Sequence, residues 1–224
     1  MPVSVIIPTL NEAACIADTV RVVRALGPHE VIVVDGGSTD GTREQAAAAD
    51  LVLAAPRGRA RQMNAGAALA SGDVLLFLHA DCTLEAGALA AAERCLHTPG
   101  VVAGCFRQVI LARGLLYRSI DWCASARVRL TGLAYGDQGL FLRRDLFQRI
   151  GGFPELRFLE DLFFSRRLRR LGRIVIAPRR VFVSPRRWRQ VGLVRQTLRN
   201  WGLTALAAAG VSPDRLARFY PAIR

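Results

Sequence analysis

Acidic side chains follow the ends of several apolar segments of this chain. Asp35 ends the run VIVVD, Asp81 follows the run LLFLHA, and the pair Glu160 and Asp161 comes shortly after a Gly-Gly-Phe bend. Carboxylates gathered in one pocket can bind a divalent cation, and one of them can accept a proton from a reacting group. The chain is therefore a candidate enzyme, provided that the fold brings these acids together.

The stretch VIVVDGGSTDGT, from Val31 to Thr42, is central to this prediction. Its β-branched run is typical of a buried parallel strand, which presents Asp35 at its carboxyl end. The two glycines after it allow a sharp turn, and Ser38 or Asp40 can cap the next helix. These glycines do not follow the G-x-G-x-x-G spacing of dinucleotide-binding proteins. An ordinary strand-to-helix turn and a ligand-binding turn both remain open.

Apolar runs alternate with segments of helical spacing through most of the chain. We predict strands at residues 3–8, 30–35, 51–54, 73–79, 101–111, 135–142, 174–177 and 181–184. We predict helices at residues 13–26, 39–49, 57–70, 85–96, 115–130, 162–171 and 191–209. This alternation predicts an α/β fold with a doubly wound, mostly parallel central sheet and helices on both faces. Ligands of such sheets bind beyond the carboxyl ends of the strands, where Asp35 and Asp81 are expected.

The composition narrows the class of protein. The chain has 224 residues, 51% of them hydrophobic, which fits one folded domain. Its five cysteines form no C-x-x-C pair, which argues against a disulfide framework or a zinc site. All 31 basic residues are Arg, so a Walker A lysine and a Schiff-base lysine are excluded. The sequence shows neither a secretory signal nor an apolar run long enough to span a bilayer, and we expect a cytoplasmic protein.

Positive charge is concentrated in the C-terminal part. Residues 1–140 hold 12 Arg against 13 acids, and residues 141–224 hold 19 Arg against 5 acids, so the two parts carry −1 and +14 of the net +13. Such a surface can attract phosphates, nucleic acid or anionic lipid headgroups, and a solvated surface without a partner is an equal alternative. The helix at 191–209 can likewise lie on a bilayer, pack as a terminal helix or form a dimer contact.

Four motifs occur in an order that resembles glycosyltransferase family 2. They are SVIIPTLNEA near the start, VIVVDGGSTDGT about one βα unit later, LLFLHAD at residues 75–81, and GGF followed by LED at residues 151–161. The resemblance runs from Val3 to about Gly172 and implies the GT-A fold of a short, soluble bacterial member. It implies one catalytic domain over residues 1–224, with a nucleotide-sugar half at about 1–112, an acceptor and catalytic half at about 113–190, and a C-terminal helical segment at 191–224.

The resemblance also implies catalytic and metal-binding residues. Asp161, the second acid of the pair with Glu160, matches the family's catalytic base, although an acid at a helix start is also an ordinary cap. Asp81 matches the last acid of the family's Asp-x-Asp metal motif, and His79 replaces the first acid. Mg²⁺ prefers oxygen ligands whereas Mn²⁺ also accepts imidazole, so we expect a divalent cation, Mn²⁺ or Mg²⁺. For His79 a structural role stays as open as metal ligation.

Other residues match the donor and acceptor sides of the family's site. Arg59 corresponds to a basic residue near the donor nucleotide, and an exposed arginine at a helix start is its alternative. Asp137, Gln138, Arg186 and Arg187 are candidates for contacts with the diphosphate or the acceptor. The remaining nucleotide-binding candidates are Pro8, Thr9, Asn11, Glu12, Asp35, Gly37 and Asp40.

Together these residues predict an inverting glycosyltransferase that moves a sugar from a UDP- or GDP-sugar to an acceptor hydroxyl or phosphate. Anionic and lipid-linked compounds are candidate acceptors, and the inner face of a membrane and a second copy of the chain are candidate associations. A nucleotidyltransferase of similar fold is the enzymatic alternative, but the Gly-rich loop expected after its first strand is absent. An Arg-rich nucleic-acid-binding module ranks third, because no RNA- or DNA-binding motif supports it.

Overall fold

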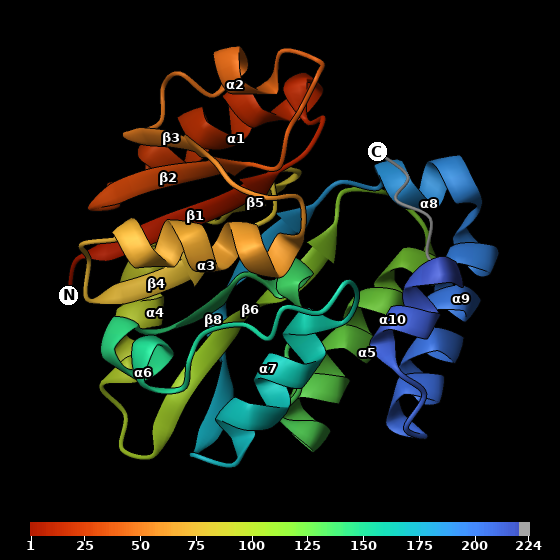
Figure 1. Cartoon of the computed structure of the whole chain (residues 1–224). Helices are drawn as coiled ribbons and strands as arrows, with labels where there is room; N and C mark the ends of the chain where they lie inside the picture. The colour runs from red at the N-terminus through yellow and green to blue at the C-terminus, as the bar shows by residue number, and fades with distance from the viewer. Residues whose placement is uncertain (220–224) are drawn as a thin grey trace.

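The computed structural model describes residues 1–219, and its first part repeats a strand followed by a helix (Figure 1). The elements of this part are β1 (Val3–Thr9), α1 (Ala13–Arg24), β2 (Glu30–Asp35), α2 (Thr42–Gln45), β3 (Leu51–Ala54), α3 (Arg59–Leu69), β4 (Val74–Phe77), β5 (Cys82–Leu84) and α4 (Ala88–Leu96). α1 buries Ile16, Val20 and Val23 on one stripe, as expected for a helix that covers a sheet.

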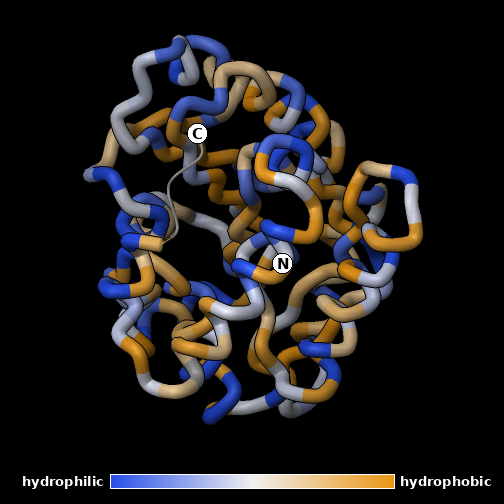
Figure 2. Tube along the Cα trace, turned by 90° about the vertical axis from the view of Figure 1, so that its right-hand side faces the viewer, coloured by the Kyte–Doolittle hydropathy of each residue, from blue (hydrophilic) through white to orange (hydrophobic). Residues whose placement is uncertain are grey.

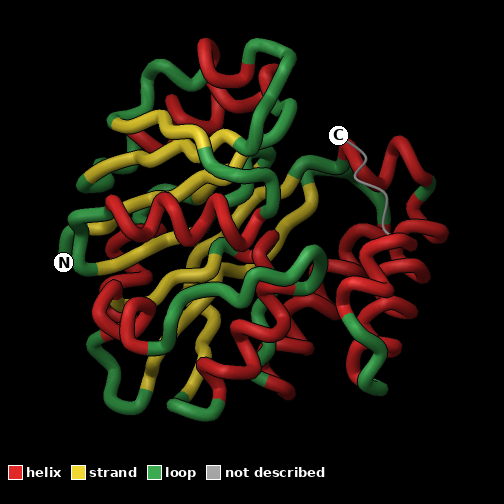
Figure 3. The backbone as a smooth tube through the Cα atoms, in the orientation of Figure 1, coloured by secondary structure: helices red, strands yellow, loops and turns green. Residues whose placement is uncertain are grey.

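The second part of the chain adds longer strands and the C-terminal helices. Its elements are β6 (Val101–Ile110), α5 (Leu115–Thr131), η1 (Gly136–Gln138), β7 (Leu140–Arg143), α6 (Arg144–Arg149), α7 (Glu160–Arg169), β8 (Arg173–Val183), α8 (Arg186–Val191), α9 (Leu193–Ala208), α10 (Pro213–Leu216) and η2 (Ala217–Phe219). Figure 3 shows the strands side by side in a curved sheet with helices around it. Within residues 1–219, no helix has the length and apolar character needed to cross a membrane.

The strands form one eight-stranded sheet in the order β3-β2-β1-β4-β7-β6-β8-β5. β1 is parallel to β2 and β4, β2 is parallel to β3, and β6 is parallel to β8. β7 is antiparallel to both of its neighbours, and β5 is antiparallel to β8. This mixed, mostly parallel sheet confirms the predicted α/β class. Because β2, β1 and β4 are adjacent and parallel, the loops that follow them lie at the same edge of the sheet.

Helices cover both faces of the sheet, as predicted. Successive residues of β1 point to opposite faces, so Val5 and Ile7 join one core and Ile6 joins the other. The first core packs against α1 and α4, and the second packs against α3, α6 and α7. The hydropathy trace shows hydrophobic and hydrophilic residues mixed within individual helices, as expected for helices with one buried side (Figure 2).

Two predicted elements of the first part were wrong in extent. The helix predicted at 39–49 is only the single turn α2, because Asp40 hydrogen-bonds the Thr42 backbone at 3.1 Å and Gly41 has a positive φ of 86°. These features keep the residues before Thr42 in a loop. β5 was missed altogether, since its three residues carry too little periodicity to predict a strand. The strand predicted at 73–79 is confined to β4, so His79 lies in the following loop.

The second part contains three further corrections. The strand predicted at 135–142 begins as the 3₁₀ turn η1, and only β7 is extended. The strands predicted at 174–177 and 181–184 are one strand, β8, which pairs with β6 across an irregularity near Arg107. The helix predicted at 191–209 is α9, and Gly192, where φ is 93°, separates it from α8, which was not predicted. Residues 220–224 of the predicted C-terminal helical segment lie outside the described residues.

Candidate active site

A cavity of about 130 Å³ lies where the ends of β4 and β8 approach η1 and the starts of α7 and α8. Three acids from separate segments line it, namely Asp81, Asp137 and Asp161. His79 and two arginines, Arg59 and Arg187, belong to the same lining. The other lining residues are Tyr135, Phe158, Leu159, Val183, Ser184, Trp188, Asn200 and Thr204. The structure therefore brings the predicted base, the predicted metal ligands and positive charge into one cavity.

The pairing of β5 with β8 places the arginines beside Asp81. Cys82 in β5 is opposite Val183 in β8, and the Ser184 N–H donates to the Asp81 carbonyl at 3.1 Å. The chain thus leaves β8 next to the point where it enters β5. Arg186 and Arg187, which follow immediately in α8, are positioned near the β4 end by this register.

Asp161 is oriented by main-chain donors. The Gly136 N–H donates to Asp161 Oδ2 at 2.7 Å, and the Leu162 N–H donates to Oδ1 at 2.7 Å. Gly136 also packs directly against His79, because a Cβ at this position would lie 2.7 Å from His79 Nε2. Each carboxylate oxygen retains a second lone pair that can accept a proton from a molecule in the cavity. This geometry suits a general base.

Glu160 differs from its neighbour, because it is buried with 2% of its surface exposed. Its Oε1 accepts a hydrogen bond from Arg59 Nη1 at 3.0 Å. Burial raises the pKa of the Glu160 carboxyl, while the Arg59 guanidinium acts in the opposite direction. Glu160 is therefore placed to fix Arg59 against the cavity, and Asp161 is the acid of this pair that lines it.

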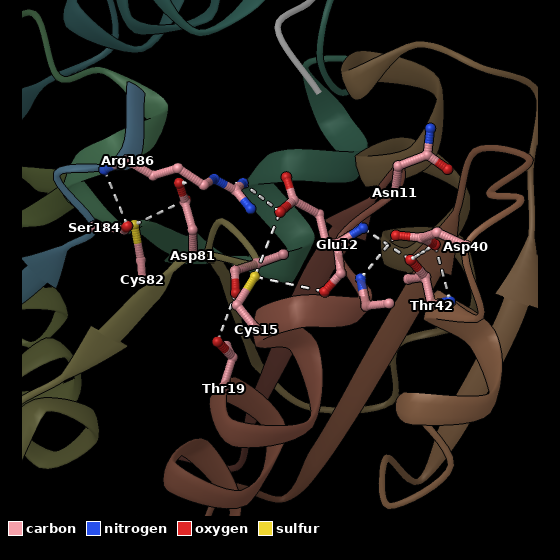
Figure 4. Close-up of polar contacts among 12 residues, drawn as sticks. Asn11, Glu12, Cys15, Thr19, Asp40, Thr42, Asp81, Cys82, Ser184 and Arg186 are labelled. Carbon is pink, nitrogen blue, oxygen red and sulfur yellow. Dashed lines mark hydrogen bonds and ion pairs between the residues drawn. The ribbon is translucent and has the colours of Figure 1, made fainter. Parts of the chain in front are cut away.

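Arg186 connects Asp81 with the nucleotide-side candidate Glu12. Its Nη2 donates to Glu12 Oε2 at 2.5 Å and lies 4.0 Å from Asp81 Oδ2 (Figure 4). Glu12 is 7% exposed, so this guanidinium balances a mostly buried carboxylate. The arrangement places a fixed positive charge between the loop after β1 and the acid after β4.

The loops after β1 and β2 are tied together by side chain to main chain hydrogen bonds. The Asn11 N–H donates to Ser38 Oγ at 2.8 Å, and Asn11 Oδ1 accepts from the Thr39 N–H at 3.0 Å. Asp40 links the same loops, because its Oδ2 accepts from the Ala13 N–H at 3.1 Å (Figure 4). These hydrogen bonds join the two loops at the edge of the sheet.

Asp35 lies below that edge and is 2% exposed. Its Oδ2 accepts from the N–H groups of Gly37 and Ser38, each at 3.0 Å, and the Ser38 hydroxyl donates to Oδ1. Pro8 and Thr9 are buried beside it, while Gly37 and Asp40 are exposed. Asp35 thus shapes the turn, and it is not among the residues that line the 130 Å³ cavity.

Three side chains could share a cation. The donor atoms of His79, Asp81 and Cys82 lie within 4.8 Å of one another. Burial raises the pKa of the Cys82 thiol well above its ordinary value, which favours the neutral thiol, whereas the thiolate is the ligating form. His79 and Asp81 therefore fit the predicted cation better than Cys82 does. Their mixed nitrogen and oxygen donors fit Mn²⁺ better than Mg²⁺.

The turn η1 contributes two candidates that differ in exposure. Asp137 lines the cavity, and burial raises the pKa of its carboxyl although the Arg127 guanidinium acts in the opposite direction. Gln138 is fully buried, and its Oε1 accepts from Arg127 Nη2 at 2.7 Å and from the Tyr135 N–H at 3.2 Å. Gln138 thus supports the turn from behind, and Asp137 faces the cavity.

Several lining residues were missed by sequence reasoning. Tyr135, Trp188, Asn200 and Thr204 lie outside the matched motifs, and three of them belong to the C-terminal helices α8 and α9. Tyr135, beside the Gly-Asp-Gln turn, and Trp188, directly after the candidates Arg186 and Arg187, carried a usable signal. Cys82 was missed for another reason, because a single cysteine has no ligand spacing.

The cavity beyond the strand ends thus gathers arginines, a candidate cation-binding acid and a candidate carboxylate base, as expected for a group-transfer enzyme of the GT-A type. The sequence model of the family described as Glycosyl transferase family 2 matches residues 4–151. The chain belongs to this family, as the motifs predicted.

Curated relatives agree with this assignment. A PGL/p-HBAD biosynthesis glycosyltransferase of Mycobacterium bovis is 34% identical over 182 residues, which cover 72% of this chain and 67% of the relative. The glycosyltransferase AglJ of Haloferax volcanii is 54% identical over 44 residues, which cover 20% of this chain and only 14% of that protein.

Two solved structures share the fold. The S. aureus TarS 1-349 structure in complex with UDP-GlcNAc superposes with a TM-score of 0.66 at 21% identity, covering 82% of this chain and 58% of that one. The glucosyl-3-phosphoglycerate synthase of Mycobacterium tuberculosis, in complex with Mn²⁺, UDP and glucosyl-3-phosphoglycerate, gives 0.59 at 21% identity, covering 81% and 70%. The GT-A fold is therefore confirmed. The chain spans little more than half of the TarS chain.

Proposed function

We propose that this chain transfers a sugar from a nucleoside diphosphate sugar to an acceptor hydroxyl or phosphate, with inversion at the anomeric carbon. The observation that carries the proposal is the single cavity that gathers Asp81, Asp161 and Arg187. Such a transfer needs a base for the acceptor proton and positive charge for the departing diphosphate. The cavity contains side chains for both tasks.

The donor nucleotide is proposed to bind along the loops after β1 and β2. Asn11 and Asp40 fix these loops to each other, and the exposed Gly37 lets a ligand approach the main chain. TarS and the mycobacterial synthase bind UDP or a UDP-sugar, which supports a UDP-sugar donor, and a GDP-sugar is the second candidate. Pro8, Thr9, Glu12 and Asp35 would support this pocket from within.

The diphosphate is proposed to lie among Arg59, Arg187 and the Asp81 side of the cavity. Fixed guanidinium groups stabilise the negative charge that develops as the bond to the sugar breaks. His79 and Asp81 would hold a divalent cation, and a bound cation would neutralise the two phosphates. Mn²⁺ is the proposed ion, and the mycobacterial synthase was crystallised with it.

Asp161 is proposed as the base. It accepts the proton of the acceptor hydroxyl while the acceptor oxygen forms its bond to the anomeric carbon. The bond from that carbon to the diphosphate oxygen breaks on the opposite side, and the nucleoside diphosphate leaves with the bonding electrons. Attack opposite to the leaving group inverts the configuration. The main-chain donors on Asp161 hold its carboxylate in place during this step.

Membrane association is the finer part of the proposal. Trp122 of α5 is 69% exposed, and Leu198 and Trp201 of α9 are 61% and 56% exposed. The excess Arg of the C-terminal part would attract the anionic headgroups of the inner face of a membrane. Stronger sedimentation with anionic than with neutral liposomes would support this contact, and equal sedimentation would exclude it. Analytical ultracentrifugation tests the candidate homodimer.

A thermal-shift panel of nucleoside diphosphates, with and without Mn²⁺, tests donor binding. We expect UDP with Mn²⁺ to raise the melting temperature, because ligands that bind only the folded state stabilise it. Asp81→Asn should lose the Mn²⁺-dependent part of the thermal shift. Asp18→Asn, on the exposed side of α1, is the matched control and should keep it. Release of pyrophosphate instead of a nucleoside diphosphate during turnover would identify the nucleotidyltransferase alternative.

A further inference from the structure

A second cavity, of about 370 Å³, lies between α5 and α9 beside the catalytic cavity. Figure 1 shows these two helices next to each other on the C-terminal side of the sheet. Most of its wall surface is apolar, with Ile120, Cys123 and Ala124 from α5 and Trp188, Trp201 and Ala205 from the C-terminal helices. Three polar side chains, Gln108, Arg127 and Thr197, line this cavity alone. A cavity of this size can enclose most of a small organic molecule.

The two cavities share one wall. Tyr135, Asp137, Trp188, Asn200 and Thr204 line both of them. A molecule whose body lies between α5 and α9 is therefore next to the cavity that contains Asp161. Trp201 is 56% exposed, so the far end of the second cavity reaches the protein surface along α9. The second cavity therefore lies between the protein surface and the cavity of the proposed base.

Asp137 supplies a polar group on this shared wall. Its Oδ1 is inaccessible to water and has no hydrogen-bond partner among the residues that the structure describes. A buried acceptor without a partner costs about 1–3 kcal/mol, and a ligand that donates a hydrogen bond removes this cost. A hydroxyl group that enters from the apolar cavity is such a donor. Asp137 therefore indicates where the polar end of a ligand lies.

We propose that the cavity between α5 and α9 binds the acceptor, and that the acceptor is an apolar alcohol, a hydroxyl group on a hydrocarbon body. This inference rests on the proposed sugar transfer. The hydrocarbon body packs between Ile120 and Trp201, and the hydroxyl group passes Asp137 to reach Asp161. The larger part of the exposed cavity wall is apolar, so a hydrocarbon body is buried there more favourably than a molecule polar on all sides. Membrane isoprenoid alcohols and small phenols share the required chemistry.

Cys123 provides a reporter that does not depend on activity, because it lines the cavity and is half-buried. Alkylation of Cys123 by N-ethylmaleimide is followed by peptide mass spectrometry in the presence of farnesol, 4-butylphenol or glycerol. At an alcohol concentration about ten times its dissociation constant, the reaction should slow about tenfold, because only the unliganded fraction reacts. UDP with Mn²⁺ is added to parallel samples, and its thermal shift is recorded.

A cavity-filling variant separates this site from general surface binding. Ala205→Phe places a ring in the cavity from the exposed side of α9 and should abolish protection of Cys123. Ala209→Phe, on an exposed position just beyond α9, is the matched control and should keep it. Both variants should retain the UDP-induced thermal shift.

The outcomes are distinct. Protection by farnesol alone assigns the acceptor to membrane alcohols, protection by 4-butylphenol alone assigns it to phenols, and protection by both supports the shared chemistry. Equal protection by glycerol, no protection by any alcohol, or protection that survives Ala205→Phe overturns the inference. If UDP still shifts the melting temperature in such a negative experiment, the proposed sugar transfer stands and only the acceptor assignment fails.

Discussion

Replacing Gly136 by alanine tests whether the turn η1 sets the geometry of the reaction. The added Cβ would lie 2.7 Å from His79 Nε2 and 3.4 Å from Asp161 Oδ2. Carbon contacts are comfortable only from about 3.5 Å, so the turn and the imidazole must separate by roughly 0.8 Å. The backbone of Gly136 lies outside the left-handed region, so the side-chain contact and not backbone strain causes the effect.

A displacement of this size acts on two groups at once. It moves His79 within the proposed cation site, and it lengthens the hydrogen bond from Gly136 to Asp161, which is 2.7 Å in the structure. Misplacement of catalytic groups by about 1 Å costs roughly 10²-fold in rate. We therefore expect kcat to fall about 100-fold, with more Mn²⁺ needed for half-maximal rate. Overpacking should lower the free energy of unfolding by about 1–3 kcal/mol.

The assay is the steady-state release of nucleoside diphosphate at saturating donor, with the Mn²⁺ concentration varied. Gly202→Ala is the matched control, because a Cβ at this position in α9 has no atom within 4 Å. Alanine is favoured over glycine in a helix, so the control should keep the wild-type rate and gain about 0.5–1 kcal/mol of stability. A Gly136→Ala protein with the wild-type rate and Mn²⁺ response would refute the role assigned to η1.

Three further predictions follow from the charges of the site. Arg59→Met should lower the free energy of unfolding by about 3 kcal/mol in denaturant titrations, because it leaves Glu160 buried and unpaired. Adding Glu160→Gln should restore most of this stability, and an unchanged stability of Arg59→Met would contradict the pairing. Burial raises the pKa of Asp137, so its ionised form opposes folding as the pH rises through the folded-state pKa. Asp137→Asn should therefore have a higher melting temperature than the wild type at pH 7. This difference should shrink as the pH falls toward 3.8, the ordinary pKa of Asp, and an opposite trend would exclude a raised pKa. Burial beside Glu12 raises the pKa of Cys15 to about 12, so iodoacetamide should label it slowly at pH 8, and rapid labelling would show that the thiol is ionised.

The first half of the site was predictable because its signals are local. An apolar run followed by polar residues indicates both a strand and its carboxyl end, and β1, β2 and β4 were predicted in this way. The parallel order of these strands then places Asp81 at the same edge as the loop that begins at Asn11. The sequence did not reveal that the Asp35 carboxylate accepts a hydrogen bond from the Ser38 hydroxyl, because that hydrogen bond depends on the conformation of the turn.

The second half of the site was harder to predict because long-range pairing builds it. β5 has three residues, and its antiparallel register with β8 is what brings Arg186 to Asp81. Asn200 and Thr204 reach the cavity only because α9 packs through Leu203 and Ala207 onto the start of α7. Helical spacing predicted an apolar face at 191–209, but it could not show which surface that face would cover. The acceptor side therefore had to come from the structure.

The most direct test of the account is the effect of Asp161→Asn on the rate of sugar transfer and on UDP affinity in the same preparation. Asparagine keeps the size of the side chain but cannot take the acceptor proton, so we predict a loss of roughly 10²–10⁴-fold in kcat with UDP affinity unchanged. Asp145→Asn, on the exposed surface of α6, is the control and should behave as the wild type. A folded Asp161→Asn protein that transfers sugar at the wild-type rate would contradict the central claim.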